Sequence, residues 1–144
     1  MGKTTATRQI NAPVEKVFEA ISDVSTFENS NPNIVKIEML SEQTSGVGTR
    51  FRETRTMNGR QATTELEFTE YARNEHVRIV SDAGGTIWDT LMKLTPEGEV
   101  TRLDMQMDAR PYKLMSRIVT PLISGMVNKA VQEDMDGLKA RLEA

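Results

Sequence analysis

Hydrophobic residues along the chain change their spacing at a few clear boundaries. Residues 4–10 form a short segment rich in β-prone residues, which predicts a first strand. Apolar residues then recur at helical spacing after a proline, which predicts a helix over about residues 13–22. A shorter helix is expected over about residues 24–28, and the turn-forming stretch 29–33 ends it.

From residue 34 onward the spacing changes to two. Alternating apolar and polar residues predict six consecutive strands, over about residues 34–39, 49–57, 62–68, 76–81, 86–94 and 101–109. Turn-forming residues separate the strands, and Asn58-Gly59 is the strongest hairpin signal among them. Strands joined by hairpins form an antiparallel sheet, and here that sheet has one apolar face.

The last thirty residues carry an apolar stripe at helical spacing that runs from Met115 to Leu142. Pro121 lies inside the stripe, so it should either kink the helix or separate a short segment from a long one. This stripe is the only long one available to cover the sheet. The prediction is an α+β fold with two short helices after the first strand. Its curved, seven-stranded antiparallel sheet wraps around a long C-terminal helix, and residues 1–144 form one domain.

Composition removes several classes of function. The 144 residues include no cysteine and one histidine, which excludes disulfides, thiolate nucleophiles and iron–sulfur clusters. We expect no metal and no cofactor. A net charge of −3 gives no indication of nucleic-acid binding. No run approaches the ~18 apolar residues of a membrane span. The N-terminus lacks the apolar core of a signal peptide, so a cytoplasmic location is expected.

Four stretches of the chain carry a resemblance to a known family. Residues 10–23 (Ile-Asn-Ala-Pro-Val-Glu-Lys-Val-Phe-Glu-Ala-Ile-Ser-Asp) resemble the N-terminal signature of the START-like, helix-grip superfamily (SRPBCC). The nearer branch is the polyketide cyclase/dehydrase and lipid-transport group. Residues 46–51, 65–71 and 96–103 fit the same pattern. One position departs from it, because many members have a Trp-Pro pair where this chain has Asn31-Pro32.

The resemblance implies a cavity between the sheet and the terminal helix. Members bind lipids, sterols, hormones, polyketides or aromatic compounds. Some members cyclise or hydrolyse them, and they share no universal catalytic residue. The expected sheet wall consists of Phe51, Leu66, Phe68, Val77, Ile79, Trp88, Met92, Leu103, Met105 and Met107. The expected helix wall consists of Met115, Ile118, Val119, Leu122 and Met126. Methionine suits an adaptable binding surface and equally suits a loosely packed core, so both interpretations stay open.

Some polar residues share the inward side of the strands with this wall. They are Glu53, Arg55, Thr64, Ser81 and Thr90. A buried charge without a partner is costly. Glu53 and Arg55 are therefore expected to pair with each other, to lie near the rim, or to contact a polar group of a ligand.

The remaining candidates for chemistry lie elsewhere. His76 is expected to face outward or to lie at a strand end. Asp89, Asp104 and Asp108 fall on the polar side of their strands, and we interpret them as a solvated face rather than a cation site. Tyr71 and Tyr112 are the other possible acids, although tyrosine more often packs with its hydroxyl in water.

Three hypotheses about function follow. The first is binding, and as a further step transport, of a small hydrophobic or amphipathic molecule in the cavity. The second is a polyketide cyclase, dehydratase or hydrolase, which needs Glu53, Arg55 or Tyr71 inside the cavity. The third is a non-catalytic partner-binding module, which a solid core with an exposed apolar patch would favour. The sequence does not distinguish a monomer from a homodimer.

Overall fold

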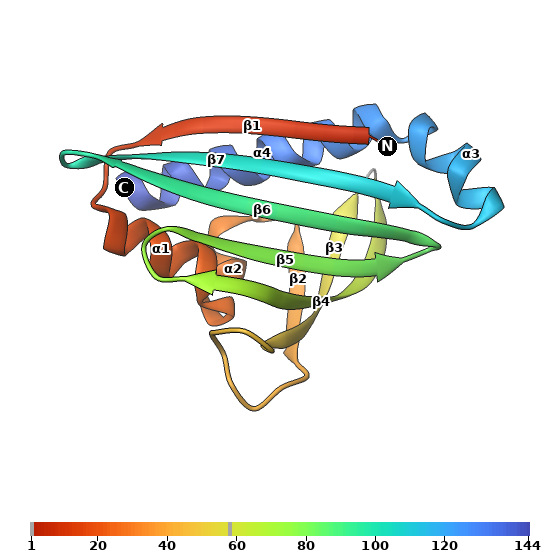
Figure 1. Ribbon diagram of the computed structural model, residues 1–144, viewed down its shortest axis with the longest axis horizontal. Coiled ribbons are helices and arrows are strands. Elements are labelled where there is room, and N and C mark those ends of the chain that lie inside the picture. Colours follow the sequence, from red (N-terminus) through yellow and green to blue (C-terminus); the bar gives the residue numbers. More distant parts are fainter. Residues whose placement is uncertain (1, 58) are drawn as a thin grey trace.

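Seven strands form one antiparallel sheet in the computed structural model, which describes residues 2–57 and 59–144. The spatial order is β1-β7-β6-β5-β4-β3-β2 (Figure 1). The strands are β1 (Gly2–Ile10), β2 (Ile34–Met39), β3 (Arg50–Met57), β4 (Arg60–Ala72), β5 (His76–Ala83), β6 (Thr86–Glu97) and β7 (Val100–Pro111). The predicted set of strands is confirmed, and the last strand returns to pair with the first.

Two groups of helices lie at opposite ends of the sheet (Figure 1). At one end are α1 (Val14–Ser22), the short 3-10 helix η1 (Val24–Thr26) and α2 (Phe27–Ser30). At the other end is α3 (Leu114–Leu122), from which α4 (Ser124–Glu143) runs back along the sheet. The two terminal helices are separate, as the proline inside the stripe allowed.

Turns and irregular positions in the ladder shape this sheet. Gly59 has a φ of +75°, a value that glycine adopts without strain, and its predicted turn partner Asn58 lies outside the described residues. The register shifts between Phe68 and Glu70 in β4 and between Ile34 and Lys36 in β2. Such irregularities bend a strand and increase its twist. They help the sheet to curve around α4.

The solid part of the core lies on the concave side, where α1, η1 and α2 meet the sheet. Its fully buried side chains come from the sheet, α1, η1 and α4: Ile10, Val17, Val24, Phe51, Phe68, Val77, Leu103, Val131 and Met135. Aromatic rings fill this end, with Phe27 edge-on to Phe51 at a centroid distance of 5.6 Å. Helices α1, η1 and α2 do not extend to the opposite end of the sheet, where α3 lies (Figure 1).

The expectation that the first part of the terminal stripe faces the sheet is wrong. On α3, the four apolar residues named for the helix wall, Met115, Ile118, Val119 and Leu122, are exposed. Ser116 and Thr120 take the buried positions instead. Helical spacing shows that one face of a helix is apolar, but the neighbouring elements decide which face turns inward.

Among the described residues, no helix combines the length and the apolar character that a membrane crossing needs.

Candidate functional site

A cavity of about 450 Å³ lies between the concave face of the sheet and α4. Strands β3 to β7 and α4 provide most of its walls, and α1 and α2 close it at one end. Twelve of the nineteen residues expected from the sequence line it: Phe51, Glu53, Arg55, Thr64, Leu66, Ile79, Trp88, Thr90, Met92, Met105, Met107 and Met126. Ser81, which shares their side of the strands, lines it too.

The remaining seven expected residues do not line this cavity. Four are the exposed residues of α3 described above. The other three are Phe68, Val77 and Leu103, which belong to the hydrophobic core and are completely buried. They lie on the correct face of their strands, but at these positions the helices of the closed end pack directly against the sheet. Strand alternation identifies which residues lie on the inner face of the sheet, but not which of them line the cavity and which pack under a helix.

Sequence reasoning missed part of the lining. The missed apolar residues are Ala20, Ile21, Phe27, Ile34, Met57, Ala62, Ala83, Ile123, Val127, Ala130, Val131 and Leu138. The missed polar residues are Ser30, Asn31 and Asp134. Most of the wall is therefore apolar, and its charged side chains are concentrated in one place.

This charged group consists of Glu53 and Arg55 on β3 and Asp134 on α4. The Arg55 Nε donates to Glu53 Oε2 at 3.0 Å. The Arg55 Nη1 and Nη2 atoms lie 3.3 Å from the two Asp134 carboxylate oxygens. The side chains of Glu53, Arg55 and Asp134 are 14%, 17% and 26% exposed. Glu53 and Arg55 thus pair with each other, which is one of the alternatives expected from the sequence. Arg55 also pairs with Asp134.

Asp134 is placed by a close approach of α4 to α2. Asn31, itself buried, donates a hydrogen bond from Nδ2 to Asp134 Oδ1, and its own Oδ1 accepts from the Asn33 amide at 2.8 Å. A Cβ atom on Gly137 would clash with the Ser30 carbonyl, so glycine is required for this approach. The position at which the chain departs from the Trp-Pro pattern therefore contacts the charged group.

The surroundings shift the pKa of both partners across the helix–sheet boundary. Burial raises the pKa of Asp134 to about 6, against the opposing effect of Arg55, while Glu53 and Glu133 add to the increase. For Arg55, burial lowers the pKa, but Asp134 and Glu53 outweigh it and leave the pKa raised. The group can therefore present a guanidinium and a carboxyl that exchanges a proton near neutral pH.

A second, smaller cavity of about 300 Å³ lies beside the first, towards α3. The two cavities share Trp88, Met107 and Val127, and Thr120 and Pro121 of α3 line the smaller one. Three side chains therefore form the partition between them.

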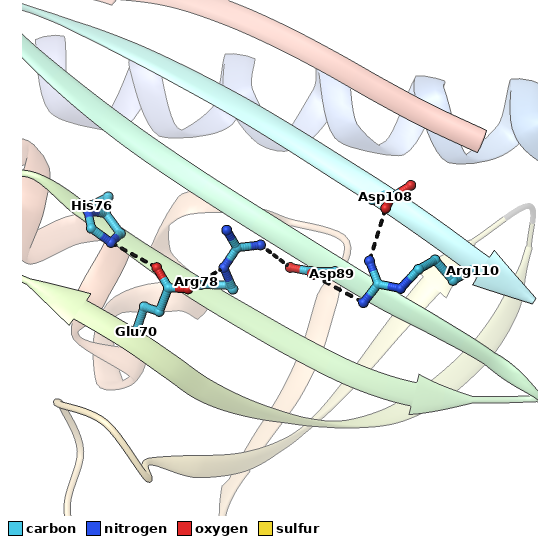
Figure 2. A network of polar contacts seen from close by, with 6 residues as sticks. All are labelled: Glu70, His76, Arg78, Asp89, Asp108 and Arg110. Carbon is cyan, nitrogen blue, oxygen red and sulfur yellow. Dashed lines mark hydrogen bonds and ion pairs between the residues drawn. The ribbon is translucent and has the colours of Figure 1, made fainter. Parts of the chain in front are cut away.

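The other predicted candidates lie on the convex face of the sheet (Figure 2). His76 Nε2 is 3.0 Å from Glu70 Oε1, and Arg78 joins Glu70 to Asp89 through contacts of 2.7 Å each. Asp89 also meets Arg110, which pairs with Asp108. Within residues 2–57 and 59–144, no group of three or more acidic, His or Cys residues is arranged to hold a metal ion.

The two tyrosines lie outside the larger cavity's lining. Tyr71 packs edge-on against Phe18 with ring centroids 5.1 Å apart. The Tyr112 hydroxyl donates to Asp82 at 2.8 Å, and this hydrogen bond raises the pKa of Tyr112. Glu53 and Arg55 are thus the acid–base candidates from the sequence that do face the cavity.

Comparisons with known proteins agree with this architecture. A family profile described as polyketide cyclase/dehydrase and lipid transport matches residues 1–143. No curated protein matches the chain. Among solved structures, a protein from Thermus thermophilus superposes with a TM-score of 0.81 at 21% identity, covering 98% of this chain and 97% of that one.

Two further structures extend the comparison. A START superfamily protein from Mycobacterium smegmatis gives a TM-score of 0.80 at 15% identity, with 98% and 97% of the two chains covered. A norcoclaurine synthase from Thalictrum flavum, solved as a point mutant with a transition-state analogue, gives 0.76 at 14% identity, with 98% and 93% covered. At such identities the likeness establishes the helix-grip fold.

Proposed function

The chain belongs to the polyketide cyclase/dehydrase and lipid-transport family, and we propose that its larger cavity binds a small amphipathic molecule with a neutral polar group. One observation carries this proposal: a largely apolar cavity of about 450 Å³ has a single charged group, Glu53–Arg55–Asp134, in its wall. Ligand pockets usually measure about 300–1,000 Å³ and combine apolar walls with a few polar groups.

Charge favours a hydroxyl or carbonyl group over a carboxylate on the ligand. Two carboxyls face one guanidinium in the cavity, so a negatively charged ligand would add repulsion and a desolvation cost. A hydroxyl can donate to Asp134 or Glu53, and a carbonyl can accept from Arg55 or from protonated Asp134. Burial of the apolar body supplies most of the affinity, at roughly 25 cal/mol per Å².

Fluorescence of Trp88 offers a direct test, because Trp88 lines the cavity and is the single tryptophan of the chain. Titrations would compare 1-dodecanol, dodecanoic acid, cholesterol and a dihydroxyanthraquinone. 1-Dodecanol and dodecanoic acid share an apolar body and differ in charge at pH 8, so they form a matched pair. The proposal expects the alcohol to bind about tenfold tighter than the acid. Failure of every compound to bind, or tighter binding of the acid, would contradict it.

Catalysis is a second candidate, and the raised pKa of Asp134 favours it. A carboxyl that titrates near neutral pH inside a cavity can act as a general acid or base. The fold accommodates enzymes, since norcoclaurine synthase shares it. The reaction class would be cyclisation or dehydration of a polyketide-like substrate, with Asp134 moving the proton and Arg55 polarising a carbonyl.

Turnover of a poly-β-ketone thioester with the wild type and with Asp134→Asn tests catalysis separately from binding. The catalytic hypothesis expects a loss of kcat of about a hundredfold or more, with little change in affinity. Equal turnover in both proteins would exclude Asp134 as the catalytic group, and no turnover in either would leave a binding protein. Transport of the ligand between membranes requires that the protein bind it. The rate at which the protein transfers ligand from one population of vesicles to another would measure transport.

A further inference from the structure

Helix α3 turns its apolar face away from the protein. Five large apolar side chains on its nine residues are between 41% and 79% exposed: Leu114, Met115, Ile118, Val119 and Leu122. Tyr112, just before the helix, is also exposed. In the part of the chain that the structure describes, nothing covers this face. A contiguous patch of large, exposed apolar side chains on a folded protein usually marks a binding surface.

Specific contacts hold α3 in this orientation. The Ser116 hydroxyl donates to the Gly85 carbonyl at 2.8 Å, and the hydroxyls of Thr120 and Thr86 lie 2.9 Å apart. The same Gly85 carbonyl accepts from the Tyr112 amide at 2.9 Å. A Cβ atom on Gly85 would clash with Lys113, so the turn between β5 and β6 fits closely under the helix. The polar side of α3 is thus the docked side, and its apolar exposure is built into the fold.

The charge of this region differs from that of the whole chain. Residues 109–132 contain four of the 18 basic residues and none of the 21 acidic ones. Arg110 is already bound by Asp89 and Asp108. Lys113, Arg117 and Lys129 are exposed, and Lys113 and Arg117 lie on successive turns at the flank of the apolar face. An apolar face with basic residues at its edge is complementary to an anionic surface.

These features favour a lipid surface over the other occupants. A symmetric dimer through α3 would bring the basic flanks of two copies together, with no carboxylate in either segment to compensate. The helix also stands out at one end of the molecule rather than forming a groove (Figure 1). An amphipathic helix with large apolar residues and basic flanks typically lies in the interface of an anionic bilayer.

We propose that α3 is an interfacial anchor that binds the protein to anionic lipid membranes. The smaller cavity, which Thr120 and Pro121 line, would then lie next to the bilayer. This proposal concerns the outer surface and does not depend on the proposed ligand of the larger cavity.

Sedimentation with vesicles tests the proposal on the full chain without any added ligand. Vesicles of phosphatidylcholine alone would be compared with vesicles containing about a third phosphatidylglycerol. The expected result is binding to the anionic vesicles at least about tenfold stronger than to the neutral ones, weakened at about 0.5 M NaCl. Absence of binding to the anionic vesicles would overturn the proposal.

Surface variants assign the binding to α3. Leu114→Ser/Ile118→Ser removes part of the apolar face, and Arg117→Glu reverses a flanking charge, all at exposed positions. The matched controls are Val35→Ser/Val47→Ser and Lys36→Glu, which lie at exposed positions in and after β2. Each α3 variant should lose about tenfold or more in vesicle affinity while both controls bind as the wild type does. Equal binding by the α3 variants would overturn the proposal.

The oligomeric state of the wild type provides the remaining outcome. Analytical ultracentrifugation in the absence of lipid should show a monomer. A dimer that Leu114→Ser/Ile118→Ser dissociates would show that a second copy covers α3, and would also overturn the proposal. Because no arm of this experiment uses a cavity ligand, its failure leaves the binding function of the cavity intact.

Discussion

Arginines and carboxylates form a cluster on each face of the sheet, and the two clusters differ in how the charges are balanced. On the convex face, Arg78 and Arg110 bind Asp89 from two sides, and Glu70 and Asp108 extend the row (Figure 2). The hydrogen bond from Arg78, followed by a weaker contribution from His76, lowers the pKa of Glu70. Glu70 and Arg110 are about half exposed to water, and the largely buried Asp89 between them is balanced by two arginines.

The concave cluster has one cation for two carboxyls and lies in the wall of a cavity. Arg55 holds both Glu53 and Asp134, yet burial still raises the pKa of Asp134 to about 6. The pKa of an arginine-paired carboxyl is thus lowered on the convex face and raised on the concave one, where burial outweighs the ion pair. The balance of charges and the access of water, more than the presence of an arginine, separate a structural cluster from one able to bind a ligand or to exchange a proton.

The largest expected effect is the loss of the inner arginine. Arg55→Met leaves two carboxyls in the cavity wall without their cation, and we expect it to lower the free energy of unfolding at pH 7 by about 3 kcal/mol. The matched variant Arg78→Met should cost about 1 kcal/mol or less, because Asp89 keeps Arg110 as a partner. Urea denaturation of both variants measures the difference. Equal losses would mean that the two clusters are energetically alike.

Asp134→Asn should change how stability depends on pH. A carboxyl whose pKa is raised from 3.8 to about 6 makes the folded protein less stable as pH rises between these values. The asparagine variant lacks this contribution. Its stability relative to the wild type should therefore increase between pH 4 and pH 7 by about 2 kcal/mol. Thermal unfolding across this range provides the measurement, and parallel curves for the two proteins would contradict the assignment.

Glu70→Gln should produce the smallest effect, with the opposite sign. A lowered pKa makes Glu70 stabilising above its ordinary value of 4.5, and this contribution disappears as pH falls through the folded pKa. The variant should have a slightly lower Tm than the wild type at pH 7 and the same Tm at pH 3. A larger difference at pH 3 than at pH 7 would reverse our interpretation of the convex cluster.

Alternation along the strands was enough to identify most of the sheet side of the cavity wall. The side of β3 that carries Phe51 also carries Glu53 and Arg55, and all three line the cavity as expected. Alternation could not separate Phe68 from Leu66, because both lie on the inner face of β4. Phe68 is completely buried against Phe27 of α2, whereas Leu66 lines the cavity. That distinction depends on where α1, η1 and α2 dock, which is a tertiary property.

The C-terminal helices were harder to predict for two reasons. The outward face of α3 depends on Ser116 and Thr120 meeting partners about thirty residues earlier, and no local signal contains those contacts. Asp134, in contrast, was visible in principle. It lies four residues after Ala130 and four before Leu138, so it interrupts the apolar side of α4 with a carboxyl. An acidic residue on the apolar side of a helix indicates a polar site in the wall of a cavity.

Filling the cavity tests the central claim most directly. Ala130→Phe places a ring in the lining of the larger cavity, whereas Ala140→Phe makes the same change at an exposed position of the same helix. Trp88 fluorescence would follow titration of each variant with 1-dodecanol, after denaturation has shown that both unfold cooperatively. Our account predicts that Ala130→Phe loses about tenfold or more in affinity and that Ala140→Phe binds as the wild type does. Equal affinity in all three proteins would contradict it, because the ligand would then bind outside this cavity.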